Sequence, residues 1–121
     1  QGCDIRVENV QRLGFDGFKF DLVLDTARRR MSVPFLSETQ IYNLLAAAAV
    51  GRALFLSADD IERGIRELKP AANRGGLVRL ARKIAVIDDS YNSNPRALEA
   101  ALRNYAALPA PRRIAVIGDM L

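Results

Sequence analysis

The chain contains no histidine and no tryptophan, and Cys3 is its only cysteine. Without histidine it cannot supply an imidazole general base, a Ser-His-Asp triad or a histidine metal ligand. One cysteine cannot form an internal disulfide, which fits a reducing cytoplasm. The longest purely apolar run extends only from Leu44 to Val50, far short of the roughly 20 residues of a membrane helix. Any chemistry must therefore use carboxylates, amides, hydroxyls or arginines.

What is present indicates a folded α/β protein. The 121 residues are 50% hydrophobic and 26% charged, a balance that excludes the disordered and collagen-like classes. This length suits one domain or pieces of two. Because the chain starts with Gln1 rather than Met and ends just after an apolar segment, we expect it to be part of a longer polypeptide.

The net charge of +4 raises the question of nucleic-acid binding. The only basic triplet, Arg28 to Arg30, lies between two strand-like segments, where a solvated hairpin turn accounts for it. No aromatic residues are interleaved with these arginines, as a surface for stacking bases would require. We therefore expect no nucleic-acid partner.

The first 36 residues alternate apolar and polar side chains with a period of two. The pattern begins at Ile5 and Val7, continues from Phe18 to Leu24, and repeats from Met31 to Phe35. Such alternation is typical of half-buried antiparallel strands. It predicts a three-stranded antiparallel meander.

Two helices should follow the meander. Ser37 and Gln40 have the spacing of a capping box, and the helical pattern continues to about Leu54. A second helix should run from about Ala58 to Leu68 with Ser57 as its N-cap.

The last third predicts a strand-helix-strand unit. The same apolar tetrapeptide occurs at 84–87 and 114–117, and unbroken apolar runs are typical of strands buried on both faces of a parallel sheet. Between them, Asn94 and Pro95 are suited to the N-cap and first position of a helix. We predict an antiparallel meander with two helices in residues 1–82, then a parallel, Rossmann-like βαβ start in residues 83–121.

The segment after the first apolar run carries the candidate chemistry. Ligands of open α/β sheets bind beyond the carboxyl ends of the parallel strands, where this chain has DDSYNSNP at Asp88–Pro95 and a Gly118-Asp119 pair. These carboxylates, amides and a tyrosine could bind a ribose hydroxyl and flank a flat base. A polar turn that only caps the helix would use the same residue types.

The two segments together resemble a known family. DDSYNSNP and the later GDML at Gly118–Leu121 closely resemble the DDSYNANP and GDMLELG segments of the Mur ligases, with Ser93 in place of alanine. The Tyr91-Asn92 pair favours the branch that adds D-alanyl-D-alanine to UDP-N-acetylmuramoyl-tripeptide. The resemblance implies that Asp89 accepts hydrogen bonds from the ribose of ATP. It also implies that Tyr91 and Asn92 lie near the base of ATP or near the interdomain cleft.

Earlier residues extend the resemblance. Asn43 matches the second asparagine of the family's Gly-x-His-Asn-x-x-Asn segment, and Arg74 matches an arginine that contacts ATP. Gln40 and Thr39 stand where the family has asparagine and histidine, so both depart from the pattern. For Gln40 we favour a structural role in the capping box.

The resemblance implies a cytoplasmic, monomeric, ATP- and Mg²⁺-dependent peptide ligase of peptidoglycan synthesis. It also implies that residues 1–82 are the last part of a central ATP-binding domain and that residues 83–121 begin a C-terminal, Rossmann-like ligase domain. The chain contains no Gly-x-x-x-x-Gly-Lys-Ser/Thr phosphate loop, and the family's magnesium ligands would lie ahead of Gln1. We therefore expect this chain alone to be inactive, with no catalytic and no metal-binding residue of its own.

Two other interpretations remain open from the sequence. A folylpolyglutamate-type ligase of the same superfamily would share the Asp and Asn-Pro elements but would carry histidine in place of Asn92. A basic interaction domain without enzymatic activity would bind nucleic acid in a salt-sensitive way and would not bind ATP.

Overall fold

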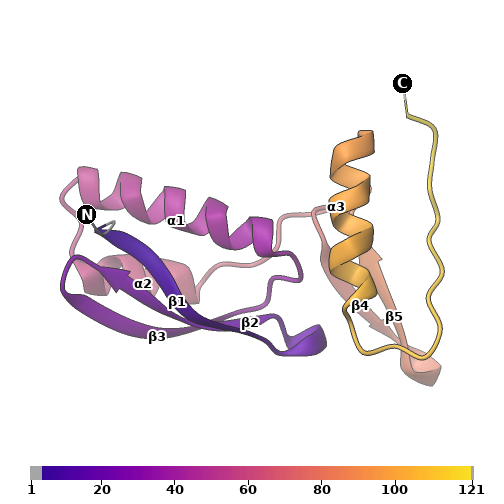
Figure 1. Ribbon diagram of the computed structural model, residues 1–121, viewed down its shortest axis with the longest axis horizontal. Helices are drawn as coiled ribbons and strands as arrows, with labels where there is room; N and C mark the ends of the chain where they lie inside the picture. Colours follow the sequence, from indigo (N-terminus) through magenta and orange to yellow (C-terminus); the bar gives the residue numbers. More distant parts are fainter. Residues whose placement is uncertain (1–3, 121) are drawn as a thin grey trace.

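The computed structural model describes residues 4–120, so Cys3 and Leu121 lie outside the described residues. The described chain forms two groups of elements that lie side by side (Figure 1). The first group comprises residues up to Arg66, and the second begins at Gly76. The fold therefore belongs to the expected mixed α/β class.

Three strands form the predicted meander of the first group. β1 (Ile5–Arg12), β2 (Phe18–Leu24) and β3 (Ala27–Val33) pair antiparallel in the order β1-β2-β3. A short 3₁₀ turn, η1 (Gly14–Asp16), joins the first two. The alternation from Phe18 to Leu24 is confirmed only on the core face, where every second side chain is at most 1% exposed. On the other face Lys19 is exposed as expected, but Asp21 and Val23 are buried.

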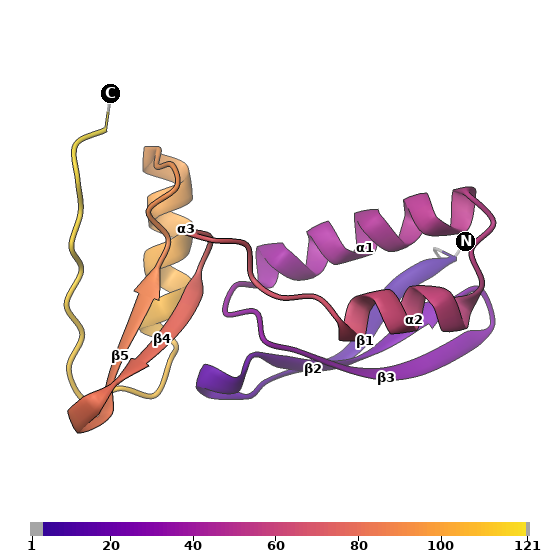
Figure 2. The ribbon, with the colours of Figure 1, turned by 180° about the vertical axis from the view of Figure 1, so that it is seen from behind.

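Two helices cover one face of this sheet (Figure 2). α1 (Glu38–Ala53) packs over β1 and α2 (Ala58–Arg66) packs over β3. Ser37 and Gln40 form the predicted capping box, and Ser57 caps α2 as expected. The helices and the sheet enclose an apolar core that includes Phe20, Ile41 and Ile61. None of the helices within residues 4–120 combines the length and apolar character of a membrane span.

The basic triplet differs from the expectation. Arg28, Arg29 and Arg30 lie within β3, and the turn before them is formed by residues 25–26. Each arginine is ion-paired: Arg28 with Glu8 and Asp21, Arg30 with Asp21, and Arg29 with acids of α2. Arg28 and Arg30 thus pair with carboxylates of β1 and β2, and Arg29 pairs with α2, so the triplet does not form a solvated turn.

The second group begins with a hairpin that the sequence did not predict. β4 (Gly76–Leu80) pairs antiparallel with β5 (Ile84–Asp88), and the 3₁₀ turn η2 (Ala81–Lys83) connects them. The boundary expected between residues 82 and 83 therefore falls inside a single hairpin. α3 (Pro95–Ala106) follows, with Asn94 as its N-cap and Pro95 at its start as predicted.

The predicted parallel strand at 114–117 is wrong for this structure. These residues form no strand, and Ile114 and Val116 are 73% and 96% exposed. β5 pairs instead with β4, which is close to it in sequence. Closing this short connection costs less chain entropy than closing a parallel crossover. Strands of a parallel sheet also require cover on both faces, whereas α3 lies against only one side of the hairpin (Figures 1 and 2).

Gly17 provides a test of the meander's packing. It has a φ of +94°, and a Cβ there would lie 2.0 Å from the Val33 carbonyl oxygen. Gly17→Ala should therefore lower the free energy of unfolding by about 3 kcal/mol, as measured by urea denaturation. Gly64, in α2, has open space around its Cβ position, so Gly64→Ala should raise that free energy by about 0.5–1 kcal/mol. Equal effects of the two substitutions would contradict this packing.

Candidate nucleotide site

The candidate site lies where two backbone segments meet at the open end of the β4-β5 hairpin. The Gly75 N–H donates to the Asp88 carbonyl oxygen at 2.8 Å, and the Tyr91 N–H donates to the Asn73 carbonyl oxygen at 3.1 Å. These hydrogen bonds extend the pairing beyond the last ladder pair, Gly76 with Asp88. Residues 73–75 and 88–91 are therefore held together as one surface.

The two neighbouring aspartates have different environments. The Asp88 Oδ1 accepts hydrogen bonds from the Ser90 N–H at 3.2 Å and the Ser90 hydroxyl at 2.7 Å. Its carboxylate is thus engaged in the turn that follows β5. The exposed Asp89 instead accepts a hydrogen bond on Oδ2 from the Tyr105 hydroxyl, at 2.9 Å. Of the two carboxylates, that of Asp89 is the more available to a ligand.

Arg74 and Tyr91 form a stacked pair at the same surface. The Arg74 guanidinium carbon lies 3.8 Å from the centroid of the Tyr91 ring, a cation-π contact worth about 0.5–1 kcal/mol at an exposed position. The tyrosine remains 63% exposed. The pair therefore offers a cation and a flat ring on the same backbone-paired surface that carries Asp89. Such a set of groups suits a ligand with an aromatic base and hydroxyl groups.

Tyr105 and Gly75 belong to this surface, although the sequence did not mark them. The helical spacing of Tyr105 with Leu98 and Ala101 is typical of an apolar stripe, yet the Tyr105 hydroxyl donates a hydrogen bond to Asp89. Burial raises the pKa of Tyr105, and the Asp89 carboxylate raises it further. Gly75 has a φ of +74°, and a Cβ there would lie 3.3 Å from the Tyr105 hydroxyl oxygen. The only sequence feature that indicates a close approach of another side chain to this backbone is the Gly75-Gly76 pair.

Gln40 connects the first group to the site. The Ser37 N–H donates to its Oε1 at 3.4 Å, and its Nε2 donates to the Arg74 carbonyl oxygen at 3.3 Å. The expected capping role is confirmed, and the contact with the Arg74 backbone is additional. A second link runs through Asn104 of α3, which donates to the Ser37 hydroxyl at 3.1 Å.

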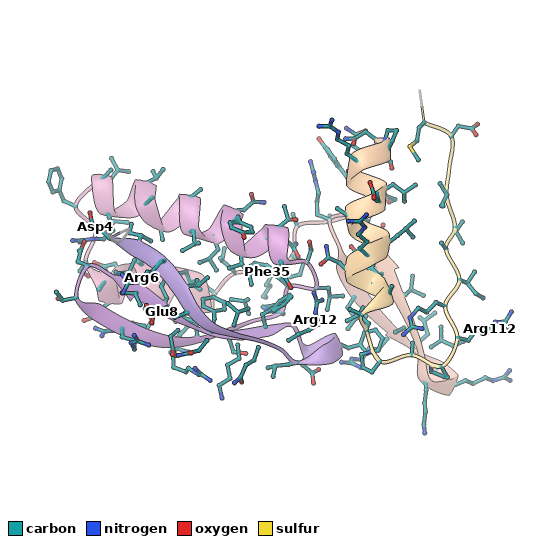
Figure 3. All side chains as sticks on the ribbon, in the orientation of Figure 1. Asp4, Arg6, Glu8, Arg12, Phe35 and Arg112 are labelled. Atoms are coloured by element: carbon teal, nitrogen blue, oxygen red, sulfur yellow. The ribbon has the colours of Figure 1, made fainter. Side chains whose placement is uncertain are left out.

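Arg12 strengthens this link from the end of β1, on the side of the sheet that faces α3 (Figure 3). Its guanidinium donates to the Leu36 carbonyl oxygen at 3.1 Å and to the Asn104 Oδ1 at 3.4 Å, and it pairs with Glu38 at 3.2 Å. Both groups of elements thus contribute polar atoms to one junction beside the site.

The structure brings together three of the five candidate residues: Arg74, Asp89 and Tyr91. Asn92 follows Tyr91 in the loop and is exposed. Asn43 is exposed on α1, one turn beyond Gln40, and within residues 4–120 it has no hydrogen bond to the other candidates. The described residues contain no group of three or more His, Cys, Asp or Glu side chains that could hold a metal ion.

Comparison with known proteins identifies the family. Residues 73–121, which contain the surface described above, match the family described as Mur ligase, glutamate ligase domain. The chain is 34% identical to the UDP-N-acetylmuramoyl-tripeptide--D-alanyl-D-alanine ligase of Escherichia coli over 86% of its own length and 23% of that relative. The chain belongs to the Mur ligase family. The resemblance noted from DDSYNSNP and GDML is thereby confirmed.

Other Mur ligases and a solved structure agree. The chain is 30% identical to the UDP-N-acetylmuramoyl-L-alanyl-D-glutamate--2,6-diaminopimelate ligase of Bacillus licheniformis, over 96% of the chain and 23% of that ligase. A crystal structure of MurF from Acinetobacter baumannii superposes with a TM-score of 0.77 at 29% identity, over 85% of this chain and 22% of that one. The chain therefore spans less than a quarter of these three relatives' length.

The raised pKa of Tyr105 can be tested by alkaline titration. The difference in phenolate absorbance between the parent chain and Tyr105→Phe should have its midpoint above the ordinary tyrosine value of about 10. The unfolded chain loses this proton near pH 10 while the folded chain keeps it. The free energy of unfolding should thus fall as pH rises above about 10, and less so in the variant. A midpoint at or below the ordinary value would contradict the contact with Asp89.

Proposed function

We propose that this chain supplies part of the ATP site of a cytoplasmic ligase that adds D-alanyl-D-alanine to UDP-N-acetylmuramoyl-tripeptide in peptidoglycan synthesis. The observation that carries the proposal is the grouping of Arg74, Tyr91 and Asp89 on one backbone-paired surface. This surface lies within the matched Mur ligase region. The substrates in this proposal are taken from the names of the relatives.

The proposed reaction has two steps. The γ-phosphoryl group of ATP passes to the tripeptide carboxylate, and ADP leaves. The amine of D-alanyl-D-alanine then attacks the carbonyl carbon of the acyl phosphate, the carbon-oxygen bond breaks, and phosphate and the new amide are released. Such chemistry depends mainly on positioning and on stabilising charge.

Within this reaction the chain's residues bind and orient ATP. Asp89 accepts hydrogen bonds from the ribose hydroxyls, and the exposed Tyr91 ring, backed by Arg74, lies against the base. Asn92 continues this surface, and Asn43 contacts the nucleotide from α1. Following the family resemblance, we assign metal binding and the transfer itself to the remainder of the ligase, and we expect this chain alone to be inactive.

The hairpin also suggests where the domains divide. β4 and β5 share one sheet, and segment 73–75 pairs with the residues that follow β5. We place the boundary between the central domain and the C-terminal ligase domain just ahead of Asn73, at the end of the connection that follows α2, instead of between residues 82 and 83.

The proposal is tested in the full-length ligase by ADP release with UDP-N-acetylmuramoyl-tripeptide and D-alanyl-D-alanine. Asp89→Ala should raise the KM for ATP by about ten- to a hundredfold, because a hydrogen bond to a charged group is lost. Asp88→Ala is the matched control. It should change this KM much less, since Asp88 is less exposed than Asp89 and its Oδ1 already accepts two hydrogen bonds from Ser90.

Two outcomes would contradict the proposal. Equal increases in KM for the two variants would refute the role given to Asp89. ADP release with diaminopimelate and UDP-N-acetylmuramoyl-L-alanyl-D-glutamate, but not with D-alanyl-D-alanine and the tripeptide, would place the protein with the other group of relatives.

A further inference from the structure

Tyr105 occupies an unusual place between the candidate site and the junction of the two groups. It is half-buried near the end of α3, and its hydroxyl lies 2.9 Å from the Asp89 Oδ2. Asn104, its neighbour in the helix, donates to Ser37 at 3.1 Å and accepts from Arg12 at 3.4 Å. The helix is thus anchored to the first group at the residue next to Tyr105.

The backbone around Gly75 makes room for the phenol. A Cβ at Gly75 would lie 3.3 Å from the Tyr105 hydroxyl oxygen, closer than most side-chain contacts. The Gly75 N–H is bonded to the Asp88 carbonyl oxygen at 2.8 Å. The Tyr105 hydroxyl therefore approaches the Asp89 carboxylate next to Gly75, whose backbone is held by this hydrogen bond and which has no side chain in the way.

We propose that Tyr105 is a positioning residue that orients the Asp89 carboxylate for the ribose hydroxyls of ATP. This inference rests on the ribose-binding role proposed for Asp89. The phenol holds Oδ2, and within residues 4–120 no other hydrogen bond to this carboxylate is present. Oδ1 is left as the acceptor for a ligand. Because the Asp89 side chain is held in one rotamer before ATP binds, it loses less conformational entropy on binding.

The state of the phenol supports this role. Burial and the adjacent carboxylate both raise the pKa of Tyr105, so it remains a donor throughout the neutral and mildly alkaline range. A phenylalanine would keep the ring in α3 and remove only the hydroxyl. Tyr105→Phe therefore separates orientation of Asp89 from packing of the helix.

The test compares ATP with its 2′-deoxy and 3′-deoxy analogues in the full-length ligase. For each enzyme the measured quantity is the ratio of KM for the deoxynucleotide to KM for ATP. Asp89→Ala should bring the ratio close to one for the analogue whose hydroxyl Asp89 binds. Tyr105→Phe should lower the same ratio by about two- to tenfold. This factor corresponds to the free-energy cost of immobilising one side chain. The double variant should match Asp89→Ala, because the phenol acts only through that carboxylate.

Tyr42→Phe is the matched control, since Tyr42 is an exposed tyrosine on α1 and should leave the ratio unchanged. If Tyr105→Phe raises KM for ATP and both analogues equally, or changes none of them, while Asp89→Ala still lowers the ratio, Tyr105 is not a positioning residue and the proposed ribose contact stands. If Asp89→Ala leaves the ratio unchanged, the ribose contact itself is wrong and the inference falls with it.

Discussion

The candidate site depends on the backbone pairing of residues 73–75 with residues 88–91. Two hydrogen bonds, Gly75 to Asp88 and Tyr91 to Asn73, continue the β4-β5 ladder past its last strand pair. Because of this pairing, Arg74 lies over the Tyr91 ring. The same pairing places Gly75, which has no side chain, next to the Tyr105 hydroxyl. A loop free of such pairing would have to order these residues when a ligand binds, at a cost in affinity.

This paired surface is small, and the first group of elements supports it from outside. Apart from Leu108, the buried apolar side chains of the described residues all come from residues 18–65. Gln40 joins that well-packed group to the Arg74 backbone, and Asn104 joins α3 to Ser37. The capping box of α1 therefore has two duties: it satisfies the helix's first N–H groups and it fixes the edge of the candidate site.

Much of the first group could be predicted because its signals are local. The period-two alternation from Phe18 to Leu24 and the Ser37-Gln40 capping box each specify structure within a few residues. The β4-β5 hairpin could not be predicted in this way. Adjacent glycines such as Gly75 and Gly76 are typical of loops, and Gly76–Leu80 is a strand only through its pairing with β5. The reverse error occurred at 114–117, where an apolar run predicts a strand but finds no neighbour to pair with. Pairing partners are non-local, so residue pattern alone does not specify them.

The candidate site, too, could be predicted from the sequence only where its signals are local. The DDSYNSNP segment identified Asp89 and Tyr91 together with the family, and the structure adds that Asp88 is engaged by Ser90. Tyr105 could not be predicted, because a tyrosine at helical spacing among Leu98 and Ala101 has the pattern of an ordinary packing residue. Its function is visible only from the distance between its hydroxyl and a carboxylate 16 positions earlier.

The proposed contact between the base of ATP and Tyr91 can be tested by photolabelling the full-length ligase with 8-azido-ATP. Trypsin cleaves after Lys83 and Arg96, which releases Tyr91 in a peptide of residues 84–96. This peptide should carry the label, and excess ATP should abolish the labelling. ATP-protected label found only in peptides from outside residues 73–96 would contradict it.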